Sequence, residues 1–469
     1  MRLSIRDFAA HLGVGARTVN KWEARGATIT LLPDTQALMD TALSRAPEEV
    51  KTRFTQTVSN GEQEQSGNKA QRVEPADSLL SAEPGTRTPH SQWNHHSITF
   101  TAGQITGEDL SFTRRDALAT GASVVLAGVA LTEPLQQWLL PIDQDAGLAT
   151  CRSEFSPTEL ASLERLVEQF RGWSSNGNGT LARKAVVAQL NDVTDRLREV
   201  SPSPATRRAF RIAAELSEVA ASMSWDAGLH RCAQRYYVLS VQLAKLAGDD
   251  GLAAIVLASL ARQCYDLGRP RDGVEIVHLA QYGSRKAATP LLRAMLATRE
   301  AWGYAQLGES QAFIRAVGLA EDYFSAGPSD GDPRALRYFD AAELAGTIGG
   351  RYRDLALARH EPQWARRAQD YTRQALDLRR PSQLRLRTFD LIGLARTQLV
   401  AADPQCACEL VRQSIPLARP WVNGRVGAKL REFHQEASRY ADIPVVRDTR
   451  DLIQELTSAN KWMKGPANG

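Results

Sequence analysis

The sequence predicts an all-α protein, and three observations agree on this. From about Thr158 onward, apolar residues recur three and four positions apart, as they do on one face of an α-helix. No segment in that region shows the alternation of apolar and polar residues that is typical of a strand. Helical segments of 15 to 20 residues follow one another in pairs with short breaks. With 469 residues, the chain is long enough for two or more domains.

The first element is a compact helical segment over residues 1–54, and its most informative stretch is residues 5–26, IRDFAAHLGVGARTVNKWEARG. A helix-turn-helix needs a small residue where its helices cross, a glycine at the turn, and apolar residues that hold the second helix. Ala9 is the small residue and Gly13 permits the turn. The apolar contacts would come from Phe8, Leu12, Val14, Val19 and Trp22.

The second helix of this motif would present polar and basic side chains to the major groove of DNA. Arg17 and Lys21 lie one helical turn apart and suit guanine edges or phosphates, and Asn20 can pair with adenine. We expect the DNA-binding residues to be Ala16, Arg17, Thr18, Asn20, Lys21 and Arg25. The alternative is an ordinary helical hairpin whose polar face is only solvated.

The motif resembles the Cro/Xre-type family, in which this part commonly reads G-V-S-x-x-T-[IV]-x-x-W-E-x-G. Residues 13–26 read GVGARTVNKWEARG, with Gly15 in place of the usual Ser or Thr cap, and Gly caps a helix less well. The first helix of the family would precede Ser4 and is missing from a chain that starts at Met1. We therefore expect either a start codon further upstream or compromised DNA binding.

The second element is a tether over residues 55–110, rich in Ser, Gly, Gln, Glu, Pro and Asn. Such a composition cannot bury enough apolar surface to offset the entropy of ordering, so we expect a flexible, disordered linker.

The third element is an apolar connecting helix over residues 111–140. Its apolar run, residues 117–131, has 15 residues, fewer than the roughly 20 that a membrane span needs. The residues before it, Ser111 to Asp116, resemble a twin-arginine export signal. Because such signals lie at the extreme N-terminus, we expect a buried or partner-facing helix and no membrane.

The fourth element is a domain of helix pairs over residues 150–460. Residues 252–269 and 270–286 form one pair, and residues 290–309 and 310–327 form the next. Leu267-Gly268 and Leu307-Gly308 end the first helices of these pairs, 40 residues apart. Further pairs are expected to break near residues 358–362 and 401–404, and another lies around residues 223–245. Aromatics such as Tyr265, Tyr304 and Tyr371 would fill the spaces between the helices.

These pairs resemble degenerate tetratricopeptide repeats, which stack into an α-solenoid. The whole chain resembles the actinobacterial Xre regulators that carry a C-terminal tetratricopeptide-like domain, on the basis of residues 33–40, PDTQALMD, and 224–237, SWDAGLHRCAQRYY. This resemblance implies that about 50 N-terminal residues bind operators and that the rest of the chain regulates them.

No residue pattern indicates an enzyme, a cofactor or a metal site. His90, His95 and His96 lack the spacing of zinc ligands, Cys406-x-Cys408 has no second pair, and phosphate-binding and nucleophile motifs are absent from the sequence. The segment GTIGG, residues 346–350, lies in a helical pattern and is expected to relax it. Five cysteines without framework spacing favour a reducing, cytoplasmic compartment.

A basic cluster has three possible roles: a groove for an acidic peptide, a second DNA contact, or a solvated ridge. Its members are Arg366, Arg367, Arg373, Arg379, Arg380, Arg385 and Arg387. The net charge of the chain, +4, does not by itself indicate a nucleic-acid partner.

The expected function is a DNA-binding transcriptional regulator. In this interpretation residues 1–54 recognise double-stranded DNA, a homodimer supplies the second half-site, and a peptide or protein at the repeat domain controls occupancy. The alternative is a tetratricopeptide scaffold that binds protein partners and no longer binds DNA.

Overall fold

The computed structural model describes residues 93–111, 125–142, 155–175, 179–200, 203–359, 361–422 and 424–462. These ranges all belong to one compact unit, residues 79–469. They hold sixteen α-helices and no strand, which confirms the all-α prediction for this part of the chain. The helix-turn-helix predicted over residues 1–54 and the greater part of the predicted tether lie outside the described residues.

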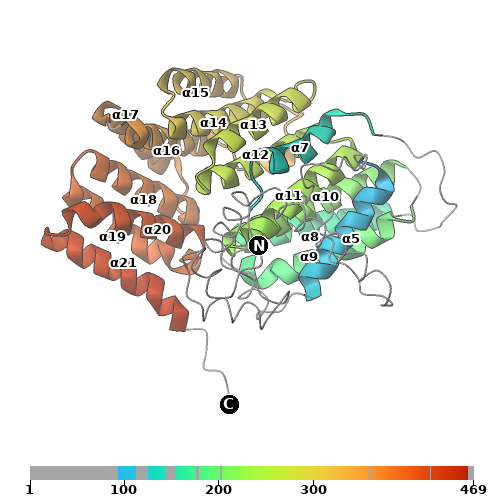
Figure 1. The fold of residues 1–469 in the computed structure, drawn as a ribbon, viewed down its shortest axis with the longest axis horizontal. Helices are drawn as coiled ribbons and strands as arrows, with labels where there is room; N and C mark the ends of the chain where they lie inside the picture. The colour runs from blue at the N-terminus through green and yellow to red at the C-terminus, as the bar shows by residue number, and fades with distance from the viewer. Residues whose placement is uncertain are drawn as a thin grey trace, which may run out of the picture. The chain divides into compact units, whose positions relative to one another are not determined.

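Most helices pair with the next helix along the chain (Figure 1). An N-terminal group consists of α5 (His95–Ser111), α7 (Val129–Gln136), α8 (Pro157–Ser175) and α9 (Gly179–Leu197). The pairs that follow are α10 (Pro204–Asp226) with α11 (His230–Ala247), α12 (Asp250–Asp266) with α13 (Pro270–Ser284), and α14 (Pro290–Leu307) with α15 (Ser310–Ser325). The last are α16 (Ala341–Arg359) with α17 (Pro362–Leu378), α18 (Leu384–Val400) with α19 (Pro404–Ala418), and α20 (Arg425–Glu436) with α21 (Pro444–Trp462).

Short 3-10 turns join some of these helices: η3 (Gln137–Leu139), η4 (Arg334–Leu336), η5 (Arg419–Trp421) and η6 (Ala437–Tyr440). The predicted pairs between residues 223 and 418 correspond to the observed pairs from α10/α11 to α18/α19. The predicted breaks near residues 358–362 and 401–404 fall between α16 and α17 and between α18 and α19.

Local signals in the sequence explain where the repeat helices begin and end. The hydroxyl of Ser203 caps α10 by accepting the backbone N–H of Thr206 at 3.0 Å, and a proline follows the cap. The predicted Leu-Gly breaks are confirmed. After α12 and α14, Gly268 and Gly308 take the left-handed conformation, with φ of 70° and 73°, which favours glycine at a helix end.

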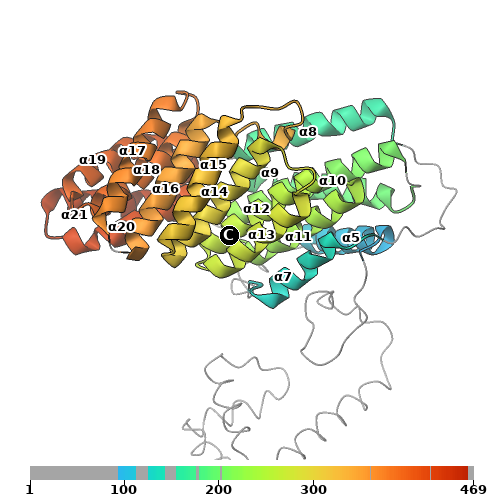
Figure 2. The same ribbon diagram turned by 90° about the horizontal axis from the view of Figure 1, so that it is seen from above.

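The pairs stack in chain order into a solenoid-like array, which Figure 2 shows from α10 to α21. We call the first helices of the pairs, α10, α12, α14, α16, α18 and α20, the first-helix layer. From α12 to α20, each member of this layer contacts the next member. Residues on these helices that are far apart in sequence are therefore brought onto one layer, as expected for stacked helical repeats.

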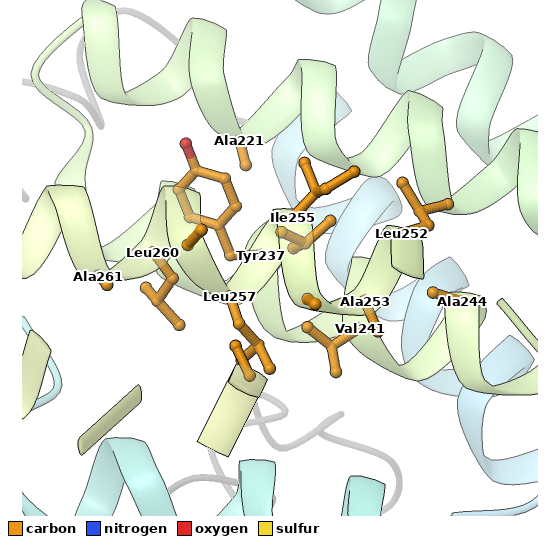
Figure 3. Close-up of a cluster of buried hydrophobic side chains, with 14 of the residues drawn as sticks. Ala221, Tyr237, Val241, Ala244, Leu252, Ala253, Ile255, Leu257, Leu260 and Ala261 are labelled. Carbon is orange, nitrogen blue, oxygen red and sulfur yellow. The ribbon is translucent and has the colours of Figure 1, made fainter. Parts of the chain in front are cut away.

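Alanine and branched aliphatic side chains form the core between the helices. Figure 3 shows one part of it, where Tyr237 and Val241 of α11 meet Ile255 and Leu257 of α12. Buried residues in the described ranges fall into two hydrophobic clusters. One, the main core, includes side chains from α5 to α17, and the other, the C-terminal core, includes side chains from α18 to α21.

The end of the predicted tether is a helix in the structure. Residues 95–111 form α5, and its buried side chains Ile98, Ala102 and Ile105 belong to the main core. Five residues, Ile98, Ala102, Ile105, Thr106 and Asp109, recur at helical spacing, but threonines and glycines between them make the pattern weak. The prediction that the tether extends to residue 110 is therefore wrong, because a packed face outweighs low helix propensity.

Of the predicted connecting helix over residues 111–140, the structure describes Ser111, which ends α5, and residues 125–140. They contain the short helix α7, which contacts α13, and η3, which contacts α11. Leu131, Leu135 and Trp138 are at most 1% exposed, whereas Val129 and Leu140 are 71% and 54% exposed, so only one face of this segment is buried. None of the described helices combines the length and apolar character of a membrane span.

The glycines of GTIGG do more than relax a helix, because they let α17 approach α16. A Cβ on Gly349 would lie 2.5 Å from the Thr372 hydroxyl of α17. A Cβ on Gly346 would lie 2.9 Å from Oδ1 of Asp390. The segment stays within the regular helix α16.

Candidate functional site

Three arginines on successive members of the first-helix layer form the candidate site. Arg262 lies on α12, Arg299 on α14 and Arg351 on α16, and we call them the arginine cluster. The Cζ atom of Arg351 lies 3.3 Å from the ring centre of Trp302, which is one helical turn after Arg299 on α14. The charge of Arg299 acts on both of the other guanidinium groups.

Two members of the arginine cluster, Arg299 and Arg351, are buried and Arg262 is partly buried, and several of their N–H groups have no hydrogen-bond partner among the described residues. Arg299 is 2% exposed, and its Nε and Nη2 have no hydrogen-bond partner in the part of the protein that the structure describes. The same is true of Nε and Nη1 of Arg351, which is 8% exposed, and of Nε of Arg262. The neighbouring Trp302 Nε1 and Tyr265 hydroxyl are also buried without a partner. Buried polar groups in folded proteins are normally paired, so this concentration is unusual.

Neighbouring carboxylates do not neutralise the cluster. The Oδ2 atom of Asp354 lies 3.4 Å from Nη1 of Arg351, but this carboxylate also accepts a hydrogen bond from Nη2 of Arg353 at 2.6 Å. Burial raises the pKa of Asp354, yet Arg353 and Arg351 outweigh it and hold that pKa at about 2. Asp354 is therefore ionised at neutral pH and shared between two arginines, and among the described residues no ion pair joins a carboxylate to Arg299.

The pKa values of Arg262 and Arg351 lie below the ordinary value for arginine. Burial, followed by the charges of Arg299 and Arg425, lowers the pKa of Arg262 to about 10. Burial also lowers the pKa of Arg351 to about 9, and the attraction of Asp354 does not restore it. Both side chains remain protonated at pH 7, and the carboxylates of Glu343 and Asp266, which raise the pKa of Arg262 and of Arg351, do not offset burial.

Close helix packing fixes the aromatic part of the site. Tyr265 occupies space beside Gly273 and Gly303, where an added Cβ would lie 2.2 Å and 3.1 Å from its ring. The rings of Tyr265 and Trp302 are 5.2 Å apart. Because Trp302 also contacts the guanidinium of Arg351, its position is constrained by an aromatic and a cationic neighbour, and the predicted filling role of Tyr265 is confirmed.

A second charged group joins the two hydrophobic cores, and we call it the inter-core joint. Asp226, at the end of α10, accepts hydrogen bonds from Nη2 of Arg385 at 3.1 Å and from Nε of Arg425 at 2.5 Å. Lys429 of α20 lies 3.4 Å from Asp266 of α12. The joint differs from the arginine cluster because Asp226 serves as the carboxylate partner of both arginines.

A third buried group holds α5 against the repeat helices. The carboxylate of Asp109 accepts two hydrogen bonds from Arg183 of α9, at 2.5 and 2.7 Å, and one from the hydroxyl of Tyr236 at 2.7 Å. Burial and the charge of Asp109 raise the pKa of the nearby Cys232 thiol to about 11. This group is fully paired, and that pairing favours a structural role.

A cavity of about 530 Å³ lies elsewhere, between α8 and α10, with Arg334 of η4 at its wall. Its lining carries four arginines and three glutamates, and several of them pair: Arg208 is bonded to Glu164 at 2.7 Å, and Arg211 lies 3.5 Å from Glu215. The cavity therefore offers less net charge to a ligand than the arginine cluster does.

The arginines predicted to form a basic cluster over residues 366–387 lie in different environments in the structure. Arg379 is 5% exposed and is bonded to Asp390 and Glu343, Arg385 belongs to the inter-core joint, and Arg387 donates to the backbone carbonyl of Leu376. The other four arginines, Arg366, Arg367, Arg373 and Arg380, are exposed. The seven residues therefore do not form one continuous basic surface.

The other predicted site residues are placed as follows. Ala16, Arg17, Thr18, Asn20, Lys21 and Arg25 lie outside the described residues. His95 and His96 begin α5, and within the described ranges no group of His, Cys, Asp or Glu side chains is arranged to hold a metal ion. The four described cysteines are unpaired thiols.

The arginine cluster was not predicted from the sequence. Its only sequence signal is an arginine at a position where helical periodicity predicts core, as in LASLARQCY around Arg262 and AMLATREAW around Arg299. A single charged residue in an apolar run does not reveal that the next repeat places another one beside it.

No family model matches the chain, and neither the curated proteins nor the solved structures contain a match.

Proposed function

We propose that this protein is a cytoplasmic, sequence-specific DNA-binding transcriptional regulator. In this proposal residues 1–54 bind the operator, the protein acts as a homodimer, and the first-helix layer of the repeat domain binds a regulatory peptide or protein. Occupancy of the repeat domain changes the affinity for DNA through the coupling of two distinct sites.

The DNA-binding half of the proposal is supported by the sequence of residues 13–26. Glycine, apolar and polar positions all fall at the offsets that a helix-turn-helix requires. Arg17, Asn20 and Lys21 supply the side chains best suited to base edges and phosphates. An ordinary helical hairpin does not require this combination of residues.

The ligand-binding half is supported by one observation above the others, the uncompensated charge of the arginine cluster. A buried unpaired guanidinium destabilises a fold, and such groups are concentrated at binding sites. A further argument is size, because a DNA reader of about 50 residues does not need some 310 residues of repeats to fold.

Fluorescence anisotropy of the full-length protein with its own promoter and with random DNA tests the proposal at two salt concentrations. We expect preferential promoter binding that weakens with salt and that the variant Arg17→Ala/Lys21→Ala loses. The control Arg366→Ala removes an exposed arginine of the repeat domain and should leave binding unchanged. Equal binding by the double variant would refute the assigned residues.

The second candidate function is a protein-interaction scaffold, and it is favoured by Gly15, which stands where the Xre-type motif commonly has a Ser or Thr cap and so weakens the start of the recognition helix. It predicts no promoter preference even at low salt, with ligand binding at the repeat domain intact. The anisotropy measurement distinguishes the two functions, because promoter preference would favour the regulator and its absence at low salt would favour the scaffold.

A further inference from the structure

The geometry points to a specific oxyanion-binding site at the arginine cluster, where Arg262, Arg299 and Arg351 bind a carboxylate or phosphate group of the ligand. This inference deepens the proposed function, because it names the chemistry of the ligand, and it rests on the proposal that the first-helix layer is the ligand-binding surface. It does not depend on DNA binding.

Charge is the first argument for an anion. Ordered water can complete the hydrogen bonds of a buried guanidinium, but it cannot supply the opposite charge. Arg299 is 2% exposed and has no carboxylate partner among the described residues, and its nearest basic neighbours on α12 and α16 add to the positive potential. An oxyanion would supply the missing charge.

The donor set is the second argument. The unpartnered atoms of Arg262, Arg299, Arg351 and Trp302 are all N–H donors, and the hydroxyl of Tyr265 can also donate. A ligand that fits this set must be an acceptor. Trp302 is already in contact with Arg351 and Tyr265, so recognition by hydrogen bonds and charge is favoured over stacking of a ligand ring on the indole.

The contrast with the other buried arginines is the third argument. Arg183 has Asp109, Arg379 has Asp390 and Glu343, and Arg396 has Glu432 and Glu436. The fold therefore supplies buried arginines with carboxylates elsewhere. At the arginine cluster the only ion pair among the described residues is that of Arg351 with Asp354, which Arg353 shares. Glu218, Glu343 and Asp266 act on the cluster without forming an ion pair with it.

Stability of the full-length protein without ligand gives the first test. The variant Arg299→Met keeps the length of the side chain and removes its charge. Because an unpaired buried charge is destabilising, we expect this variant to unfold at a higher temperature than the wild type in chloride buffer. A lower midpoint would show that Arg299 is satisfied within the protein and would overturn the inference.

Calorimetric titration gives the second test, with inorganic phosphate and with a capped tetraglutamate peptide as probes at constant ionic strength. Phosphate binding alone would identify a phosphate-bearing ligand, and peptide binding would identify a carboxylate ligand. Either affinity should fall about tenfold or more in Arg299→Gln and in Arg262→Gln, since each loses charged hydrogen bonds. Arg366→Gln is the matched control on the exposed face of α17 and should bind like the wild type.

Two results would refute the oxyanion site: no binding of either probe to the wild type, or equal binding to the wild type and both cluster variants. The titration is repeated with the Arg17→Ala/Lys21→Ala protein. Oxyanion binding by that variant, together with its failure to bind DNA, would separate the two activities. Oxyanion binding by a wild type that binds no DNA would refute only the regulator and leave the site standing.

Discussion

Removing the Asp226 carboxylate should uncouple the C-terminal core from the main core. The side chain is 13% exposed and accepts hydrogen bonds from Arg385 and Arg425, which are 15% and 19% exposed. Deleting one partner of a buried charge pair costs about 3–5 kcal/mol, and the partial exposure of all three groups places the expected loss near the lower value. For a fold stabilised by about 5–15 kcal/mol, this is a large fraction.

Urea denaturation followed by tryptophan fluorescence measures this loss. Trp225 reports directly, because its ring lies 4.4 Å from Cζ of Arg425. For Asp226→Ala we expect an earlier transition or a separate first step, in which the helices from α18 to α21 detach. The exposed Asp330→Ala is the control and should unfold like the wild type.

A double-mutant cycle with Arg425→Ala separates the ion pair from other effects of the substitutions. The second substitution should cost less in the Asp226→Ala background than in the wild type, because the pair is already broken. Strict additivity would refute the reasoning, as would an Asp226→Ala midpoint equal to that of Asp330→Ala.

The same ion pair gives a pH dependence with a defined sign. Burial raises the pKa of Asp226, but Arg425 and Arg385 outweigh it, so the folded-state pKa lies below the ordinary value. A depressed carboxyl pKa contributes stability that is present above the unfolded-state pKa, about 4, and is lost as the pH falls through the folded-state value. Asp226→Asn should therefore lose stability relative to the wild type at pH 7, and the difference should shrink below about pH 4.

Three further substitutions test the packing described above. Asp109→Asn leaves the buried guanidinium of Arg183 without its charged partner, so it should lower the free energy of unfolding measured in urea by about 3 kcal/mol. Amide exchange in α5 should become faster, and unchanged exchange would contradict the anchoring role. Gly303→Ala places a Cβ 2.2 Å from the side chain of Val274, so it should lower the free energy of unfolding by about 1–3 kcal/mol, although alanine has the better helix propensity. A higher thermal midpoint would count against a tight contact. Trp138→Ala removes a side chain that is 1% exposed and should cost about 3–5 kcal/mol, with rapid proteolysis near α7; resistance to protease would argue against docking of this segment.

Local sequence signals were sufficient to predict where the repeat helices lie. Apolar spacing, Leu-Gly ends and prolines at helix starts predict the pairs from α12 to α15 closely, because each signal acts within one or two helical turns. They were insufficient to predict α5, because its threonines and glycines obscure the helical spacing of its buried residues. The DNA-binding assignment of residues 16–25 stays a prediction, since these residues lie outside the described ranges.

The sequence by itself determined the helical class, the pairing of helices and most of their ends. Only the tertiary structure decided which arginines are neutralised, because ion pairs such as Arg425 with Asp226 join residues 199 positions apart. The sequence reveals the partners of neither Arg379 nor Arg299, yet the fold places Asp390 and Glu343 in ion pairs with the first and, among the described residues, no carboxylate in an ion pair with the second. The electrostatic energy of a charge depends on its neighbours in space and on its burial, and neither is encoded by local spacing.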